Sequence, residues 1–260
     1  MKLSAILSEN HSYWTKRAQG YSQVNQRELE SQQRCIWQRT LCQELQTHFP
    51  DRPHEMLRIL DIGCGPGFFS IVLAEEGFAV TAIDLTSAML QEAQMNAGLL
   101  AHQICFMEMN AEELSFPDHS FDAIVSRNLT WNLPHPERAY AEWNRVLKPG
   151  GILLNFDANW YHYLNDDQAR QAYEEDRKRT ADLGIQDENI GEGFEVMEQI
   201  ASRIPITRTM RPDWDREVLE NLGLQITINE QIWNRVWSAE EQINFSSTPM
   251  FLICGKKLGS

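Results

Sequence analysis

A glycine-rich turn flanked by two acidic residues carries the clearest chemical pattern in the sequence. The turn is the pentapeptide GCGPG at 63–67; Asp61 stands two positions before it, and Asp84 follows Asp61 by 23 residues. Glycines lack a Cβ and adopt positive φ easily, so backbone amides in such a turn can approach a ligand closely. A helix that begins directly behind the turn favours polar or anionic ligand groups. The pattern therefore predicts a site for a small polar ligand, with a tight strand–helix turn that binds nothing as the alternative.

The spacing of the glycines separates two classes of cofactor site. A nicotinamide-binding loop reads GxGxxG, whereas here the third glycine comes one residue early and gives GxGxG. Asp84 ends a predicted strand, where its carboxylate can accept hydrogen bonds from both hydroxyls of an adenosine ribose. Both acids and the turn stand at the carboxyl ends of successive predicted strands, where open α/β sheets bind ligands. The spacing opposes a nicotinamide-dependent oxidoreductase.

Alternating strands and helices are predicted to position this turn. Strands are expected at 57–62, 78–85, 104–109, 121–126, 152–156 and 247–256, with a strand-rich stretch at 224–237; helices are expected at 68–76, 88–100, 136–147 and 213–222, and a turn at 148–151. Strands separated by helices of this length indicate βαβ units and a parallel sheet that helices cover on both faces.

Two segments interrupt this rhythm, and the whole chain is predicted to form one domain over 1–260. Residues 1–50 are helical and polar, and we expect them to form a lid over the ligand site. The cofactor-binding core is expected at 51–158. Residues 159–212 are too long for a simple crossover and are expected to form a helical cap, and 213–260 complete the sheet.

Four segments give the sequence a family resemblance. They are LDIGCGPG at 60–67, AIDLTSAML at 82–90, NAEELSFPDHSFDAIVS at 110–126 and RVLKPGG at 145–151. In this order and spacing, over roughly 55–160, the sequence resembles the class I S-adenosylmethionine-dependent methyltransferases, especially those of ubiquinone and menaquinone biosynthesis. The resemblance implies a Rossmann-like α/β fold: a seven-stranded, mostly parallel sheet whose last strand is antiparallel, with helices on both faces.

The resemblance also implies a cofactor and the residues that bind it. The cofactor would be S-adenosylmethionine, with S-adenosylhomocysteine as product and no metal. The implied cofactor-binding residues are Asp61, Gly63, Cys64, Gly65, Gly67, Asp84, Leu85, Met89, Asn110, Ala111, Glu112 and Arg127, with Tyr21 and Arg17 from the N-terminal helix. The family usually has Asp where Asn110 stands, but an amide carbonyl can still accept a hydrogen bond from the adenine amine. Arg127 is bulkier than the small residue often found there.

Polar and aromatic residues follow the fourth and fifth predicted strands, on the rim where the methyl acceptor would lie. His162 and Asp157 are candidate general bases, and Asn128 is a third candidate for the reaction. Trp131, Trp160 and Tyr161 are candidate acceptor-binding residues, because aromatic faces near acidic groups suit a cationic or flat molecule. The alternative is that these aromatic residues only pack the cap onto the sheet.

The charge balance restricts the partners of the chain. With 23 basic and 37 acidic residues the net charge is −14, which opposes binding to nucleic acid and to anionic membranes. Residues 160–200 alone hold 11 acidic and 4 basic residues. Five cysteines without a CxxC pair are typical of a cytoplasmic protein.

These observations together predict the function. We expect a cytoplasmic enzyme, a monomer or homodimer, that methylates a neutral or cationic small-molecule substrate, with no nucleic acid and no membrane as partner. A nucleic-acid or ribosome methyltransferase and a non-catalytic S-adenosylmethionine-binding module are the alternatives.

Overall fold

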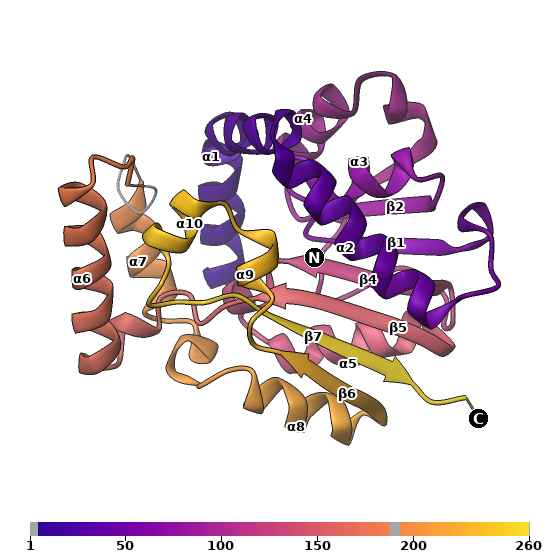
Figure 1. Cartoon of the computed structure of the whole chain (residues 1–260). Coiled ribbons are helices and arrows are strands. Elements are labelled where there is room, and N and C mark those ends of the chain that lie inside the picture. Colours follow the sequence, from indigo (N-terminus) through magenta and orange to yellow (C-terminus); the bar gives the residue numbers. More distant parts are fainter. Residues whose placement is uncertain (1–4, 188–192, 260) are drawn as a thin grey trace.

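A seven-stranded sheet forms the centre of the computed structural model, which describes residues 5–187 and 193–259 (Figure 1). Its strands are β1 (Arg58–Ile62), β2 (Ala79–Asp84), β3 (Ile104–Glu108), β4 (Phe121–Arg127), β5 (Leu147–Asp157), β6 (Leu224–Asn229) and β7 (Phe251–Lys257). The strand order is β3-β2-β1-β4-β5-β7-β6. β1 to β5 pair in parallel, and β7 runs antiparallel between β5 and β6. The predicted fold class is confirmed.

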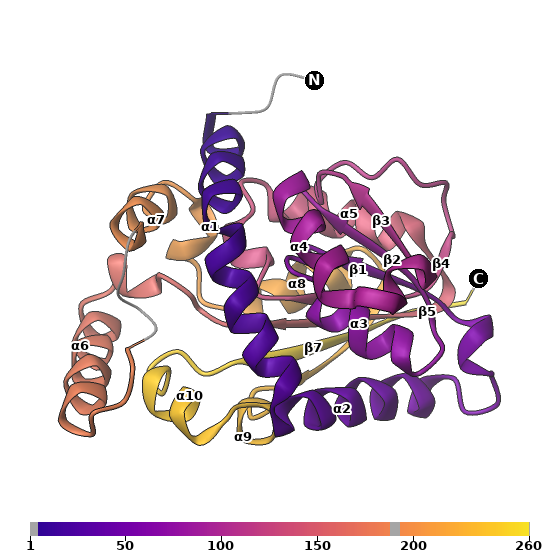
Figure 2. The same ribbon diagram turned by 90° about the horizontal axis from the view of Figure 1, so that it is seen from above.

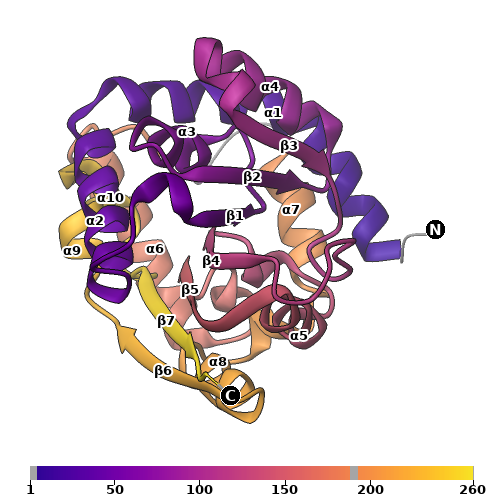
Figure 3. The same ribbon diagram turned by 90° about the vertical axis from the view of Figure 1, so that its right-hand side faces the viewer.

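Helices cover both faces of the sheet (Figure 3). The connecting helices are α3 (Phe68–Glu75), α4 (Ser87–Ala97), α5 (Pro136–Val146) and α8 (Asp213–Asn221). Trp37 and Phe69 belong to the apolar cluster on one face, and Tyr140, Trp143 and Leu219 to the cluster on the other. Short 3-10 helices are η1 (His54–Met56), η2 (Gly98–Gln103), η3 (Thr130–Asn132), η4 (His162–Leu164) and η5 (Pro205–Arg208).

Two helices form the N-terminal segment: α1 (Ala5–Glu30) and α2 (Gln32–His48). Ser31 separates them, because its extended backbone ends α1 while its side chain accepts a hydrogen bond from Gln33 N and caps α2. α1 crosses the edge of the sheet at the carboxyl ends of its parallel strands (Figure 2). Its buried residues include the polar Asn10, Asn25 and Glu28. This helix therefore covers a polar region as well as apolar core.

The segment after β5 holds α6 (Asp167–Asp182) and α7 (Phe194–Ala201). α6 lies away from the sheet (Figure 1). α7 is fixed by a separate apolar cluster, in which Met197 and Ile200 join Trp131 from the loop after β4. The apolar side chains of α7 thus tie the segment to the rim of the sheet.

The largest differences from the sequence predictions lie at three elements. The strand-rich stretch ends at Asn229, and α9 (Trp233–Val236) and α10 (Ala239–Asn244) follow, because the side chains of Ile232 and Val236 are both buried in the core at a helical spacing. β5 begins at Leu147 rather than at 152, since Leu147 already pairs with Phe121 before a register shift. The last strand begins at 251 rather than at 247. Among the described residues, no helix is long and apolar enough to cross a membrane.

Candidate active site

The glycine turn between β1 and α3 has a backbone that side chains would disturb. Gly63 has a φ of +68°, and a Cβ there would lie 2.7 Å from Leu129 Cδ2. Gly67 has a φ of +93°, and its Cβ would lie 3.0 Å from the Cβ of Ala93 on α4. Glycine at these positions lets the loop after β4 and helix α4 approach the turn closely.

Two carboxylates flank this turn, as the sequence predicted. Asp84 Oδ2 accepts a hydrogen bond from Gly65 N at 3.0 Å, and its Oδ1 accepts from Thr86 N at 2.9 Å. Burial raises the pKa of Asp84, against the opposing effect of these hydrogen bonds. Asp61 accepts from Ser70 Oγ at 2.5 Å, and burial raises the pKa of Asp61 to about 7 although Ser70 and Arg127 act in the opposite direction. Both carboxylates thus stand in partly dehydrated positions beside the turn.

The main cavity opens beside the turn and encloses about 740 Å³ of space, part of which is continuous with the solvent. Its lining residues come from α1, the glycine turn, the ends of β2 and β4, the start of α4, and the segments that follow β2, β3 and β4. A smaller cavity of about 310 Å³ is lined by Asp61 and Cys64 and shares Tyr21, Gly63 and Arg127 with the main cavity. The two cavities therefore adjoin along the turn.

Two residues that line the main cavity carry a buried amide oxygen without a hydrogen-bond partner among the described residues. These oxygens are Oδ1 of Asn10, which is 2% exposed, and Oδ1 of Asn132, which is 7% exposed. Asn10 Nδ2 donates to the backbone oxygen of Asn132 at 2.8 Å and joins α1 to η3. Buried acceptors of this kind are costly unless something bonds them, so a ligand with N–H or O–H donors suits this end of the cavity.

A buried ion pair fastens α1 to the end of β4. Arg127 donates to both carboxylate oxygens of Glu28, at 2.6 and 2.9 Å. Its guanidinium carbon also lies 4.6 Å from the ring centroid of Phe68 and 5.3 Å from that of Trp37. Glu28 raises the pKa of Arg127 further above its ordinary value, against the effect of burial. Arg127 is thus both a wall of the cavities and an anchor for α1.

Comparison with known proteins assigns this arrangement to a family. Residues 60–155 match the methyltransferase domain family. The chain contains a methyltransferase domain. The resemblance to class I S-adenosylmethionine-dependent methyltransferases is confirmed.

Curated relatives match this chain over the methyltransferase domain, and the match does not extend to the rest of their sequences. A ubiquinone biosynthesis O-methyltransferase of Alkalilimnicola ehrlichii is 36% identical over 37% of this chain and 40% of its own. A ubiquinone/menaquinone biosynthesis C-methyltransferase of Bradyrhizobium is 36% identical over 46% of this chain and 48% of its own. The matched part therefore spans less than half of either relative.

Solved structures share the fold over more of the chain. A Methanococcus maripaludis protein assigned as an S-adenosyl-L-methionine-dependent methyltransferase is 18% identical, with a TM-score of 0.58 over 95% of this chain and 94% of its own. The geranyl diphosphate C-methyltransferase of Streptomyces coelicolor, solved with S-adenosyl-L-homocysteine, is 15% identical, with a TM-score of 0.55 over 84% of this chain and 77% of its own. At these identities the likeness concerns the fold alone.

Most of the predicted cofactor-binding residues of the methyltransferase domain come together in space. Those that line the main cavity are Tyr21, Gly63, Gly65, Asp84, Leu85, Met89, Asn110, Ala111 and Arg127. Asp61 and Cys64 line the smaller cavity instead. Three predicted residues line neither cavity: Gly67, Glu112, whose Oε1 accepts from His135 N at 2.7 Å, and Arg17, which interacts with Tyr13. Sequence reasoning missed the buried amides Asn10 and Asn132, for which no local pattern exists.

The two candidate bases lie outside both cavities, which corrects their expected position. Asp157 is fully buried; its Oδ2 accepts from Arg211 Nη1 at 2.6 Å and from Trp131 N at 3.1 Å. Burial raises the pKa of Asp157, and Arg211 lowers it. The ring of His162 lies beside the backbone oxygen of Thr207, with Nδ1 at 3.0 Å. Neither residue is among the lining residues of the two cavities, and each has a partner within the 159–212 segment.

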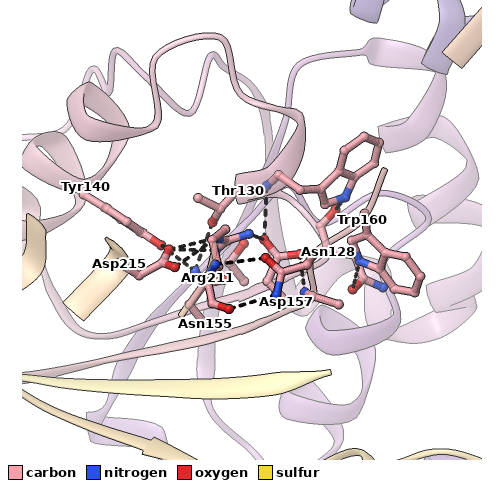
Figure 4. Close-up of polar contacts among 12 residues, drawn as sticks. Asn128, Thr130, Tyr140, Asn155, Asp157, Trp160, Arg211 and Asp215 are labelled. Carbon is pink, nitrogen blue, oxygen red and sulfur yellow. Dashed lines mark hydrogen bonds and ion pairs between the residues drawn. The ribbon is translucent and has the colours of Figure 1, made fainter. Parts of the chain in front are cut away.

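Asp157 belongs to a buried polar network that the sequence did not indicate (Figure 4). Arg211 Nη2 donates to Asp215 Oδ1 at 2.8 Å, and the hydroxyl of Tyr140 also donates to Asp215. Asn155 Nδ2 donates to Tyr140 and to Thr130, at 2.9 Å each. The network joins the loops after β4 and β5 to the end of the 159–212 segment, so it fixes the rim of the cavity.

The three candidate acceptor-binding residues are not among the lining residues of the main cavity, whereas the third catalytic candidate, Asn128, lines it. Trp131 is buried, and its ring lies 5.0 Å from that of Tyr161. Trp160 and Tyr161 line a separate cavity of about 360 Å³. Trp160 Nε1 donates to Asn128 Oδ1 at 3.1 Å (Figure 4). This hydrogen bond is the direct link between the two cavities.

Proposed function

We propose that the chain transfers a methyl group from S-adenosylmethionine to a small-molecule acceptor. The observation that supports this most strongly is the matched methyltransferase domain, whose glycine turn and Asp84 border the main cavity. The net charge of −14 favours a neutral or cationic small molecule over nucleic acid. A cytoplasmic location and a monomeric or dimeric state remain predictions.

The residues around the main cavity fit the parts of this cofactor. Asp84 keeps free lone pairs beside its bonds to Gly65 and Thr86, and these can accept from the ribose hydroxyls. Asn110 Oδ1 accepts from Glu112 N at 3.0 Å, and its second lone pair can accept from the adenine amine. The methionine part would lie along the glycine turn, between Asp61 and Arg127.

The cofactor supplies a methyl group already activated by its sulfonium, so the main tasks of the protein are to orient the acceptor and exclude water. Leu7, Trp14, Leu129 and Leu133 provide apolar walls for this purpose. Among the described residues, the ionisable side chains that line the main cavity are Tyr21, Asp84 and Arg127. Asp84 and Arg127 are held in the bonds above. This lining favours an acceptor atom that is nucleophilic near neutral pH without a strong base.

Two measurements test the proposal. Calorimetry should detect binding of S-adenosylhomocysteine but not of a nicotinamide cofactor, and Asp84→Ala should weaken that binding by about tenfold or more, since the ribose loses a charged hydrogen-bond acceptor. The exposed Asp51→Ala is the matched control. Methyl-labelled S-adenosylmethionine with a metabolite extract should then give a labelled small molecule. Binding without any product would favour the binding-module alternative, and label in RNA would favour a nucleic-acid methyltransferase.

A further inference from the structure

A second cavity in the structure has a lining unlike that of the main one. We call it the aromatic cavity; its lining residues are Trp160, Tyr161, Tyr163, Tyr173, Phe194, Asn244, Phe245, Ser247 and Thr248. They come from the loop after β5, from α6, from the start of α7, and from α10 and the loop behind it. The aromatic cavity has no lining residue in common with the main cavity. It is therefore a separate site, built by segments outside the cofactor-binding core.

Aromatic rings form most of its walls. The rings of Tyr163 and Tyr173 stack with centroids 4.0 Å apart and planes 9° apart, and the ring of Trp160 meets that of Phe245 edge-on at 5.3 Å. Burial raises the pKa of Tyr161 and of Tyr163 above the ordinary value, so their phenols stay neutral. The walls thus offer aromatic rings, whose π faces attract cations.

One residue in the lining of the aromatic cavity carries a buried polar atom without a partner among the described residues. This atom is Oδ1 of Asn244, a residue that is 2% exposed. Its Nδ2 donates to the backbone oxygens of Gln186 at 3.1 Å and Glu240 at 3.3 Å. These two acceptors fix the amide orientation, because a rotated amide would bring its oxygen against them. Asn244 Oδ1 can therefore still accept a hydrogen bond from an N–H or O–H group of a ligand.

Charged side chains of both signs lie around the aromatic cavity. Its lining, as far as the chain is described, holds no cationic side chain. Glu198 lies behind the wall, where it accepts a hydrogen bond from Tyr163 at 2.8 Å. The guanidinium of Arg177 lies 5.1 Å from the ring centroid of Tyr173, and its charge is balanced by an ion pair with Asp187. Arg177 also donates a hydrogen bond to the backbone oxygen of Asn244, so its guanidinium contacts two residues of the lining.

We propose that the aromatic cavity binds an organic amine in its protonated form, with at least one N–H donor and a compact apolar body. The aromatic walls hold the charge and the apolar body, and Asn244 Oδ1 accepts the N–H. The identity of this amine rests on the proposed function: it is either the methyl acceptor or a separate ligand that acts on the main cavity. Trp160 connects the two sites, because it lines the aromatic cavity and its indole donates to Asn128 of the main cavity (Figure 4).

Ligand-observed NMR titration of the full chain tests the proposal with four probes. Benzylammonium should bind more tightly than benzyl alcohol, by roughly three- to thirtyfold, since only the former brings a positive charge to the aromatic walls. Benzyltrimethylammonium should bind more weakly than benzylammonium, because it keeps the ring and the charge but has no N–H for Asn244. Benzoate should not bind. Equal binding of benzoate and benzylammonium, or no binding of either, would overturn the proposal.

Two variants locate the binding. Asn244→Leu should weaken benzylammonium binding by roughly tenfold, whereas Asn221→Leu, at an exposed position, should leave it unchanged. Thr248→Trp places a large side chain into the aromatic cavity from a half-buried loop position and should abolish binding. This variant tests the proposal even if Asn244→Leu fails to fold. Unchanged binding in Thr248→Trp contradicts the assignment.

Calorimetry with S-adenosylhomocysteine, run on the same samples, keeps this proposal separate from the proposed function. Normal S-adenosylhomocysteine binding without amine binding would refute the amine site alone. Amine binding without S-adenosylhomocysteine binding would refute the cofactor site alone. If benzylammonium binds, incubation with S-adenosylmethionine separates its two roles. A methylated amine identifies an acceptor site, and a changed S-adenosylhomocysteine affinity without product identifies a separate ligand; either result supports the amine site.

Discussion

Removing the charge of Glu28 should release the N-terminal helix from the main cavity. Glu28 is the bidentate partner of Arg127, and their side chains are only 10% and 14% exposed. Breaking a buried ion pair by removing one partner typically costs about 3–5 kcal/mol, because the other charge stays buried and unpaired. Here Arg127 keeps its contacts with the rings of Trp37, Phe68 and Phe69, and the pair is not fully dehydrated. We therefore expect Glu28→Gln to cost about 2–3 kcal/mol.

This loss should fall on α1 rather than on the sheet, because the ion pair joins α1 to the end of β4. Hydrogen exchange of the α1 amides should speed up by roughly 30- to 150-fold, while the amides of β1 and β4 keep their protection. Binding of S-adenosylhomocysteine should weaken in parallel, since α1 lines the cavity. Glu30→Gln, two residues on and exposed, is the matched control. Equal α1 protection in the two variants would refute the reasoning.

Three further changes test the packing of the site. Gly67→Ala should lower the melting temperature more than Gly77→Ala, because both have positive φ but only Gly67 has neighbours within 4 Å of the added Cβ; equal shifts would contradict this. Arg211→Met should cost about 3–5 kcal/mol in denaturant unfolding, as it leaves two carboxylates buried without their cation, against a small effect of the half-exposed Arg216→Met. Asp61 has a folded pKa raised from 3.8 to about 7, so the folded state binds the extra proton. The wild type should therefore lose stability relative to Asp61→Asn as the pH rises from about 4 through 7, and a pH-independent difference would count against a raised pKa.

The amino-acid sequence alone determined the cofactor-binding core. The glycine turn, the acids after β1 and β2 and the alternation of apolar runs are local patterns, because each depends on the conformation of a few neighbouring residues. They placed β1 to β4 within one residue of their observed bounds and brought Gly63, Gly65 and Asp84 to one cavity. Local backbone geometry and parallel strand pairing leave little freedom in such a core.

Only the tertiary structure decided what surrounds that core. Arg127 and Glu28 are 99 residues apart in sequence, and Asp157 and Arg211 are 54 apart, so no spacing rule pairs them. From the sequence, Asp157 is a candidate base at the rim. In the structure its carboxylate accepts a hydrogen bond from the buried Arg211, at the far end of the 159–212 segment. Trp160 and Tyr161 follow β5 as expected, yet α6, α7 and α10 close around them and form a different cavity. The sequence determines which side chains reach the rim, but the packing of distant segments determines which ones face a ligand.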